Sequence, residues 1–404
     1  MVDQTQAAAI SEDRGPSAAL ITVVALATGS LVANLYYAQP LVASIGPAIG
    51  LSPNIAGSIV SITQIGYGLG LFLLVSLADL VENRLLVLAT LSCTVIGLIG
   101  AAVSTSALPF FAASLLIGLS STGAQVLLPF IAHLVPAAQR GRVVGNIMGG
   151  LLTGIMLARP VSLFIAASFG WRAVFWCSAV LMVFIGLALA RMMPRHKPHG
   201  GMHYGQILAS IFTLVRDLPA VRWRAAYQLF LFAAFNLFWT ASPLMLAERF
   251  GMSEHGIALF ALAGAGGAFA APIAGRLADR GLSRATTAGA MLTIALAFWA
   301  TGWAAAALAI AVLVVLAVII DGAVQANQVV SQRIIFSVPP QVRGRVNAFY
   351  MTCTFIGGAI GSVLGTLTYH WGGWTATAIV GGSMGAFALL LFFLELGRAR
   401  VVPV

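Results

Sequence analysis

Asp321 is the acidic residue that lies deepest in an apolar stretch of this 404-residue chain. Of the 11 Asp and Glu residues, it alone falls in the middle of a long apolar run, which begins near residue 306. Burying a charge at that depth in a membrane costs roughly 2.5–3.5 kcal/mol on insertion scales, so such a carboxylate is a functional candidate. A buried carboxyl can alternate between a protonated and an ionised form. We expect Asp321 either to carry a proton or bind a substrate cation, or to form a fixed ion pair.

Arg159 is the matching basic residue, because it alone among the 21 Lys and Arg residues falls in the middle of an apolar run. Two roles are open for it. Arg159 could pair with Asp321 across the molecule, or it could bind an anionic group of a ligand directly.

Glutamines follow Asp321 at helical spacing. Asp321, Gln325, Gln328 and Gln332 fall at i, i+4, i+7 and i+11, which places them on one face of a helix. An earlier apolar run carries Gln125, which lies 203 residues before Gln328. We therefore expect two matching polar stripes, of which one contains an acid.

A polar and aromatic stretch interrupts the first apolar run at residues 34–41 (NLYYAQPL), and a similar one recurs at residues 236–244 (NLFWTASPL). A polar group that faces lipid without a partner costs several kcal/mol or so, which favours a buried or cavity-lining position. Packing of polar side chains between helices is the alternative. The side chains expected to line a central cavity are Asn34, Tyr36, Tyr37, Gln39, Gln64, Gln125, Asn236, Trp239, Gln325 and Gln328.

The composition is that of a protein that crosses a membrane many times. The chain is 60% hydrophobic and 8% charged, with a mean hydropathy of +0.98, whereas soluble domains carry roughly 25% charged residues. A spanning helix needs about 20 apolar residues. Twelve runs meet this length: 18–45, 54–78, 85–104, 107–134, 143–168, 172–193, 223–247, 253–278, 284–303, 306–334, 345–369 and 374–396.

The basic residues orient these spans. If the N-terminus is cytoplasmic, 18 of the 21 Lys and Arg residues fall in cytoplasmic segments, so both termini are expected on that side. The net charge of +10 then needs no nucleic-acid partner. The expected organisation is a tail (1–17), a six-helix bundle (18–193), a cytoplasmic linker (194–222), a second six-helix bundle (223–396) and a short tail (397–404).

The two halves of the chain repeat. Residues 135–143 (VPAAQRGRV) return as residues 338–346 (VPPQVRGRV), an offset of 203. Six helices map onto six with the same orientation, because six is an even number. Folds with parallel repeats of this kind bind their substrates between the halves.

Two loops carry related charged motifs. Gly275, Asp279, Arg280 and Arg284 follow a Gly-x-x-x-Asp-Arg-type pattern, and Asp79 with Arg84 forms a partial first copy. With these motifs in register, the whole chain resembles the major facilitator superfamily, and within it the bacterial drug:proton antiporter-like group. The resemblance implies an all-α membrane fold of twelve transmembrane helices in two pseudo-symmetric six-helix bundles.

The resemblance also implies a conformational latch at these loops. A carboxylate at one helix end can hold a neighbouring helix end by charge-assisted hydrogen bonds and release it when the halves rock. Ordinary charged helix termini at the membrane surface are the alternative. The latch residues would be Asp79, Arg84, Arg140, Arg142, Asp279, Arg280, Arg284, Arg343 and Arg345.

Together these features predict a secondary transporter that works by alternating access in a bacterial cytoplasmic membrane, embedded in the lipid bilayer. We expect proton-coupled efflux of small lipophilic or drug-like compounds; the alternative is a facilitator or efflux protein for sugars or other polar metabolites. A polytopic enzyme or receptor is a remote alternative. We expect a small-molecule substrate, protons as the coupling ion and a monomer, with no catalytic residues, cofactor, metal or nucleic acid.

Overall fold

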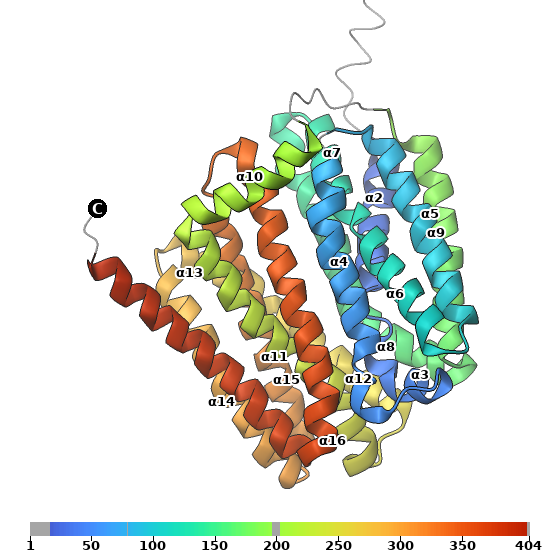
Figure 1. The fold of residues 1–404 in the computed structure, drawn as a ribbon, viewed down its shortest axis with the longest axis vertical. Helices are drawn as coiled ribbons and strands as arrows, with labels where there is room; N and C mark the ends of the chain where they lie inside the picture. The colour runs from blue at the N-terminus through green and yellow to red at the C-terminus, as the bar shows by residue number, and fades with distance from the viewer. Residues whose placement is uncertain (1–16, 79, 196–202, 402–404) are drawn as a thin grey trace, which may run out of the picture.

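The computed structural model describes residues 17–78, 80–195 and 203–401, and its regular structure in these ranges is helical (Figure 1). Ten helices in this part of the chain are long and apolar enough to cross a membrane. The last, α16, contains two spans, because Gly372 and Gly373 have non-helical backbone angles. Counting α16 as two spans and adding the interrupted first segment, which begins with α2, gives the twelve predicted spans.

The element bounds follow the predicted runs. They are α2 (Ala18–Ala33), η1 (Gln39–Leu41), α3 (Val42–Ala48), η2 (Pro53–Ile55), α4 (Ser58–Leu77), α5 (Asn83–Val103), α6 (Ala107–Ser121), α7 (Gly123–Leu134), α8 (Ala137–Phe169), α9 (Trp171–Met192), α10 (Tyr204–Asp217), α11 (Pro219–Phe250), α12 (Glu254–Gly264), η3 (Ala265–Phe269), α13 (Ala270–Asp279), α14 (Ser283–Ala306), α15 (Ile310–Ile335) and α16 (Pro340–Val401).

The prediction of one continuous helix over residues 18–45 is wrong. Helix α2 ends at Ala33, residues 34–38 form turns, and the chain continues through η1 into α3. Pro40 lies in the first turn of η1 and has no backbone N–H to donate. The break falls in the polar stretch, where side-chain amides take part in the hydrogen bonding of the interior.

Helices α2 and α8 pack in backbone contact at three glycines. A Cβ atom at Gly154 would lie 2.7 Å from the Cα of Gly29, and one at Gly29 would lie 3.0 Å from the carbonyl carbon of Gly150. Small residues at these positions let two membrane helices approach closely. This contact sets the position of Arg159, which lies further along α8.

The two halves of the chain meet along α4 and α16, which lie side by side (Figure 1). Thr366 Oγ1 accepts a hydrogen bond from the Gly57 N–H at 3.1 Å and donates one to the carbonyl of Asn54 at 3.0 Å. Ser61 Oγ donates to the carbonyl of Ala359 at 2.6 Å. These contacts close the end of the molecule that lies opposite α10.

The linker between the halves contains an amphipathic helix, α10, that we did not expect in the polar connector. Its buried side chains, Ile207 and Ile211, are four residues apart and lie on one face. Tyr204 Oη donates to the carbonyl of Leu73 in α4 at 3.0 Å, and Arg345 donates to Ser210 Oγ at 2.6 Å. Helix α10 is therefore attached to both halves.

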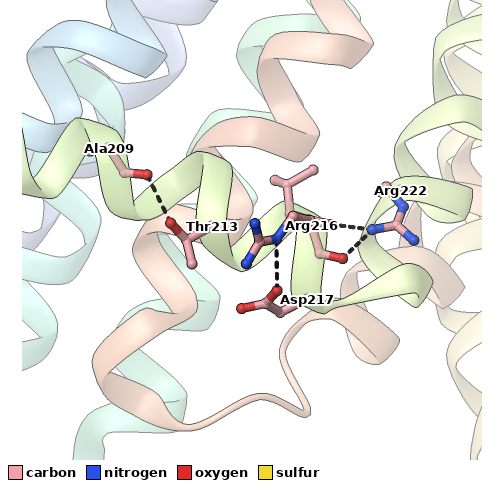
Figure 2. Close-up of polar contacts among 6 residues, drawn as sticks. Ala209, Thr213, Arg216, Asp217 and Arg222 are labelled. Atoms are coloured by element: carbon pink, nitrogen blue, oxygen red, sulfur yellow. Dashed lines mark hydrogen bonds and ion pairs between the residues drawn. The ribbon is translucent and has the colours of Figure 1, made fainter.

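The C-terminal end of α10 is polar (Figure 2). Arg216 Nε lies 3.3 Å from Asp217 Oδ1, and both side chains are exposed. Arg222, at the start of α11, donates to the carbonyls of Val215 and Arg216. These bonds satisfy carbonyl groups that would lack a partner at the end of the helix.

Candidate functional site

The break after α2 brings Gln39 to the centre of the molecule. Its side chain is fully buried, and its Nε2 donates to Asn236 Oδ1 at 3.0 Å and to Thr240 Oγ1 at 3.3 Å. Its Oε1 accepts a hydrogen bond from Arg159 Nε at 2.9 Å. One amide thus connects the first segment to α8 in its own half and to α11 in the other half.

Asn236 connects the same two halves a second time. Its Oδ1 also accepts a hydrogen bond from Gln64 Nε2 in α4 at 2.6 Å, and its Nδ2 donates to the carbonyl of Phe232 at 3.0 Å. Gln39, Gln64 and Asn236 therefore form a buried amide network between the bundles. The structure brings together these three residues, which were all predicted as cavity-lining.

Arg159 lies within a cage of aromatic rings. Its side chain is 4% exposed, and its Cζ lies 5.1 Å from the ring centre of Tyr36, 4.9 Å from that of Phe235 and 4.8 Å from that of Trp239. Aromatic faces attract a guanidinium group through the negative charge of their π-systems. The Nη2 atom of Arg159 is buried and has no hydrogen-bond partner.

Asp321 lies on the other side of Trp239. The residue is 8% exposed, and its Oδ1 accepts a hydrogen bond of 2.7 Å from the indole Nε1 of Trp239. Two glycines, at the end of α12 and in the 3₁₀ segment η3, allow this arrangement. A Cβ atom at Gly264 would overlap the indole of Trp239, and one at Gly267 would overlap the backbone and Cβ of Asp321.

Arg159 and Asp321 do not form an ion pair. The two ion pairs formed among the described residues are Arg216–Asp217 and Arg333–Asp279. Instead, the indole of Trp239 contacts both interior charges, with its ring against Arg159 and its N–H on Asp321. In this conformation, Arg159 and Asp321 are therefore connected through Trp239 and not by a direct ion pair.

Two predicted residues of the first segment lie away from this cluster. Asn34 Oδ1 accepts a hydrogen bond from Ser178 Oγ in α9 at 2.6 Å, so Asn34 packs between helices of its own half. Tyr37 lines a groove between α2 and α8 with a volume of about 380 Å³. Asn34 and Tyr37 both interact with Ser178, so the two residues lie on one side of the first segment, as their spacing predicts.

The glutamines of the two predicted stripes bond within their own halves of the structure. Gln125 Nε2 donates to Tyr67 Oη at 3.1 Å within the first half. Gln328 Oε1 accepts from Gln228 Nε2 at 3.4 Å, and Gln228 Oε1 accepts from Asn327 Nδ2 at 2.7 Å, all in the second half. Gln325 is half-buried.

Sequence reasoning missed Phe235 and Gln228, and it considered Thr240 only as an alternative to Trp239. Phe235 and Thr240 directly flank predicted residues of α11, and Gln228 lies eight residues before Asn236, which is close to the same face of that helix. The polar spacing along α11 could have indicated Gln228. The ring of Phe235 carried no signal in a chain this rich in apolar residues.

The latch residues whose contacts the structure describes bind within their own half or to α10. Asp279 pairs with Arg333, which joins α13 to α15 within the second half, and Arg84 donates to the carbonyl of Ala190 within the first half. Arg343 donates to the carbonyl of Val338 at 3.0 Å, and Arg345 bonds α10.

Among the described residues, Arg142, Arg280 and Arg284 form no hydrogen bond or ion pair across the halves. Asp79 and the side chain of Arg140 lie outside the described residues.

Interior charges, a two-bundle architecture and an amide network between the bundles define a multi-spanning membrane transporter. The sequence profile of the Major Facilitator Superfamily matches residues 21–337 and 228–403. The chain is 38% identical to "Uncharacterized transporter YgaY" of Escherichia coli O157:H7 over 381 residues, which cover 93% of this chain and 95% of the relative. This chain belongs to the Major Facilitator Superfamily.

Two further comparisons agree with this assignment. The chain is 34% identical to "Probable transporter SCO4007" of Streptomyces coelicolor over 394 residues, with coverage of 91% of this chain and 89% of the relative. The crystal structure of a D-xylose-proton symporter superposes with a TM-score of 0.76 at 17% identity and covers 93% of this chain and 97% of that one. The second likeness is one of fold.

Proposed function

We propose that this protein is a proton-coupled secondary transporter in which Asp321 binds and releases the proton. The observation that carries the proposal is the environment of Asp321: a buried carboxyl group with one hydrogen bond, from Trp239, and no ion pair among the described residues. A carboxylate fixed by a cation would stay charged throughout a cycle. Asp321 is held in place by a neutral donor, so both of its protonation states are available.

We propose alternating access as the mechanism, with the α10 end and both termini on the cytoplasmic side. The hydrogen bonds of Thr366 to Gly57 and Asn54 join the halves at the opposite end. Gln39, Gln64 and Asn236 hold the bundles together at the level of the interior charges. Rocking of the halves would break these bonds and form others.

We propose that the protein exports small lipophilic or drug-like compounds in exchange for protons. This direction rests on the resemblance of the sequence to the drug:proton antiporter-like group. The rings of Tyr36, Phe235 and Trp239 suit a largely apolar ligand. The amides of Gln39, Gln64 and Asn236 bond to one another, which leaves fewer of them for the hydroxyl groups of a sugar. The alternative of a polar-metabolite transporter is therefore less well supported.

The test is transport by the full chain in proteoliposomes under an imposed pH gradient, with a panel of labelled compounds. We expect the gradient to drive transport and Asp321→Asn to abolish that dependence. Asp217→Asn is the matched control, because it removes an exposed acid at the end of α10. Transport that responds to the gradient equally in the wild type and Asp321→Asn would remove Asp321 from the mechanism, and transport with no pH dependence would indicate a facilitator.

A further inference from the structure

Arg159 is a buried charged group that proton coupling through Asp321 leaves without a role. We propose that Arg159 binds the anionic group of the substrate, and that the substrate class is a planar or aromatic organic monoanion such as an aromatic carboxylate. This inference rests on the proposed transport function and specifies what the same site binds.

The hydrogen bonding of the guanidinium supports an anionic ligand. A guanidinium has five N–H donors arranged as a planar fork that matches a carboxylate. Here Nε is bound to Gln39, whereas Nη2 is buried without a partner. A buried cation without an adjacent anion is costly, and contacts with aromatic rings offset only part of that cost. A carboxylate at Nη2 would supply both the missing hydrogen bond and the missing charge.

The surroundings of Arg159 indicate the rest of the ligand. Tyr36, Phe235 and Trp239 present rings around the cation, so an aromatic body can pack on them. The groove between α2 and α8, with a volume of about 380 Å³, is lined by Tyr37 and Ala158, the sequence neighbours of Tyr36 and Arg159, and lies outside the cage.

The same geometry links the anion to the proton. The charged and titratable groups within electrostatic reach of Arg159 are Asp321 and Tyr36. When Asp321 is ionised, its negative charge partly balances that of Arg159. When Asp321 is protonated, an anionic ligand has no competitor for Arg159. The anion and the proton should therefore bind together.

The test measures binding to the full chain in lipid nanodiscs by calorimetry. The probes are benzoate and 1-naphthoate, each paired with its uncharged amide, at about pH 6 and about pH 8, where both acids are ionised. We expect at least one acid to bind about tenfold or more tightly than its amide, and to bind more tightly at the lower pH. We expect Arg159→Gln to remove this difference while amide binding is retained, which also shows that the variant is folded.

Two further variants complete the test. Asp321→Asn should bind the acid as tightly as the wild type does at the lower pH, and without pH dependence. Arg172→Gln is the control, because it removes an arginine that also lies over an aromatic ring, 4.2 Å from the centre of Trp171, but outside the cage. Acids that bind no better than their amides, or a preference that survives Arg159→Gln, would overturn the proposal.

Failure of this inference is distinguishable from failure of the proposed function. If Asp321→Asn abolishes pH-driven transport but Arg159→Gln leaves acid binding unchanged, proton coupling stands and the anion site is wrong. If acid binding depends on Arg159 but Asp321→Asn leaves pH-driven transport intact, the anion site stands and the proton assignment is wrong.

Discussion

Trp239 donates a 2.7 Å hydrogen bond from its indole Nε1 to Oδ1 of Asp321, and the same indole ring lies 4.8 Å from the Cζ of Arg159. One side chain of the second half thus contacts the interior acid of its own half and the interior base of the other. Any movement of the halves that displaces Trp239 changes the surroundings of both charges.

Trp239→Phe should change the pH dependence of transport. Phenylalanine keeps a ring beside Arg159 but has no N–H to donate to the Asp321 carboxylate. A hydrogen bond to a charged group contributes about 1.5–3 kcal/mol, so the ionised form is destabilised and the pH midpoint of transport should rise by about one to two units. The measurement is the pH profile of transport in proteoliposomes.

Trp374→Phe is the matched control, because its indole also donates a buried hydrogen bond, 3.2 Å to Thr301 Oγ1. An unchanged midpoint in Trp239→Phe would contradict the role of this bond.

Gln39→Leu should destabilise the protein by about 1–3 kcal/mol. The substitution leaves Arg159 Nε buried without its acceptor, and an unsatisfied buried polar group costs about that much. The measurement is thermal unfolding of the purified protein. Gln325→Leu, which removes a half-buried amide, should lower the free energy of unfolding by less. In a double-mutant cycle, Gln39→Leu and Arg159→Leu should cost less together than the sum of the single changes, and strict additivity would show that the two side chains do not interact.

Gly57→Leu should open the end of the molecule opposite α10. A Cβ atom at Gly57 would lie 2.7 Å from Thr366 Oγ1, and a larger side chain cannot fit against α16. The distance between spin labels on exposed Ser52 and His370, measured by double electron–electron resonance, should therefore increase. Gly186→Leu is the control, because no atom lies within 4 Å of a Cβ at that glycine. A distance distribution equal to the wild type in Gly57→Leu would contradict the prediction.

Gly154→Leu should destabilise the first half by separating α2 from α8. Overpacking of a close contact costs roughly 1–3 kcal/mol, and here the obstacle is the backbone of Gly29, which cannot rotate away. The measurement is the unfolding temperature, compared with that of Gly149→Leu. A Cβ at Gly149 meets no atom within 4 Å, so this neighbour tests the same change of residue in open space. Equal unfolding temperatures for the two variants would show that the glycine contact is not needed.

Much of the architecture follows from local properties of the chain. The twelve spans could be predicted because the cost of placing polar residues in hydrocarbon restricts a spanning helix to an apolar run of a certain length. The two interior charges were visible for the same reason, since Asp321 and Arg159 stand out against apolar neighbours. The sequence by itself therefore determined the class of the protein, its division into repeated halves and the residues that carry charge within them.

Tertiary structure alone decided how those residues meet. Helical periodicity predicts shared faces only where a helix continues, and the first segment unwinds at residues 34–38. Beyond that break, Gln39 turns toward Asn236 and Arg159, whereas Asn34 faces Ser178. The indole of Trp239 lies between Arg159 and Asp321 because Gly264, at the end of α12, and Gly267, in η3, pack closely against Trp239 and α15 respectively. Contacts between side chains far apart in sequence depend on how helices pack, and no spacing along one helix records that packing.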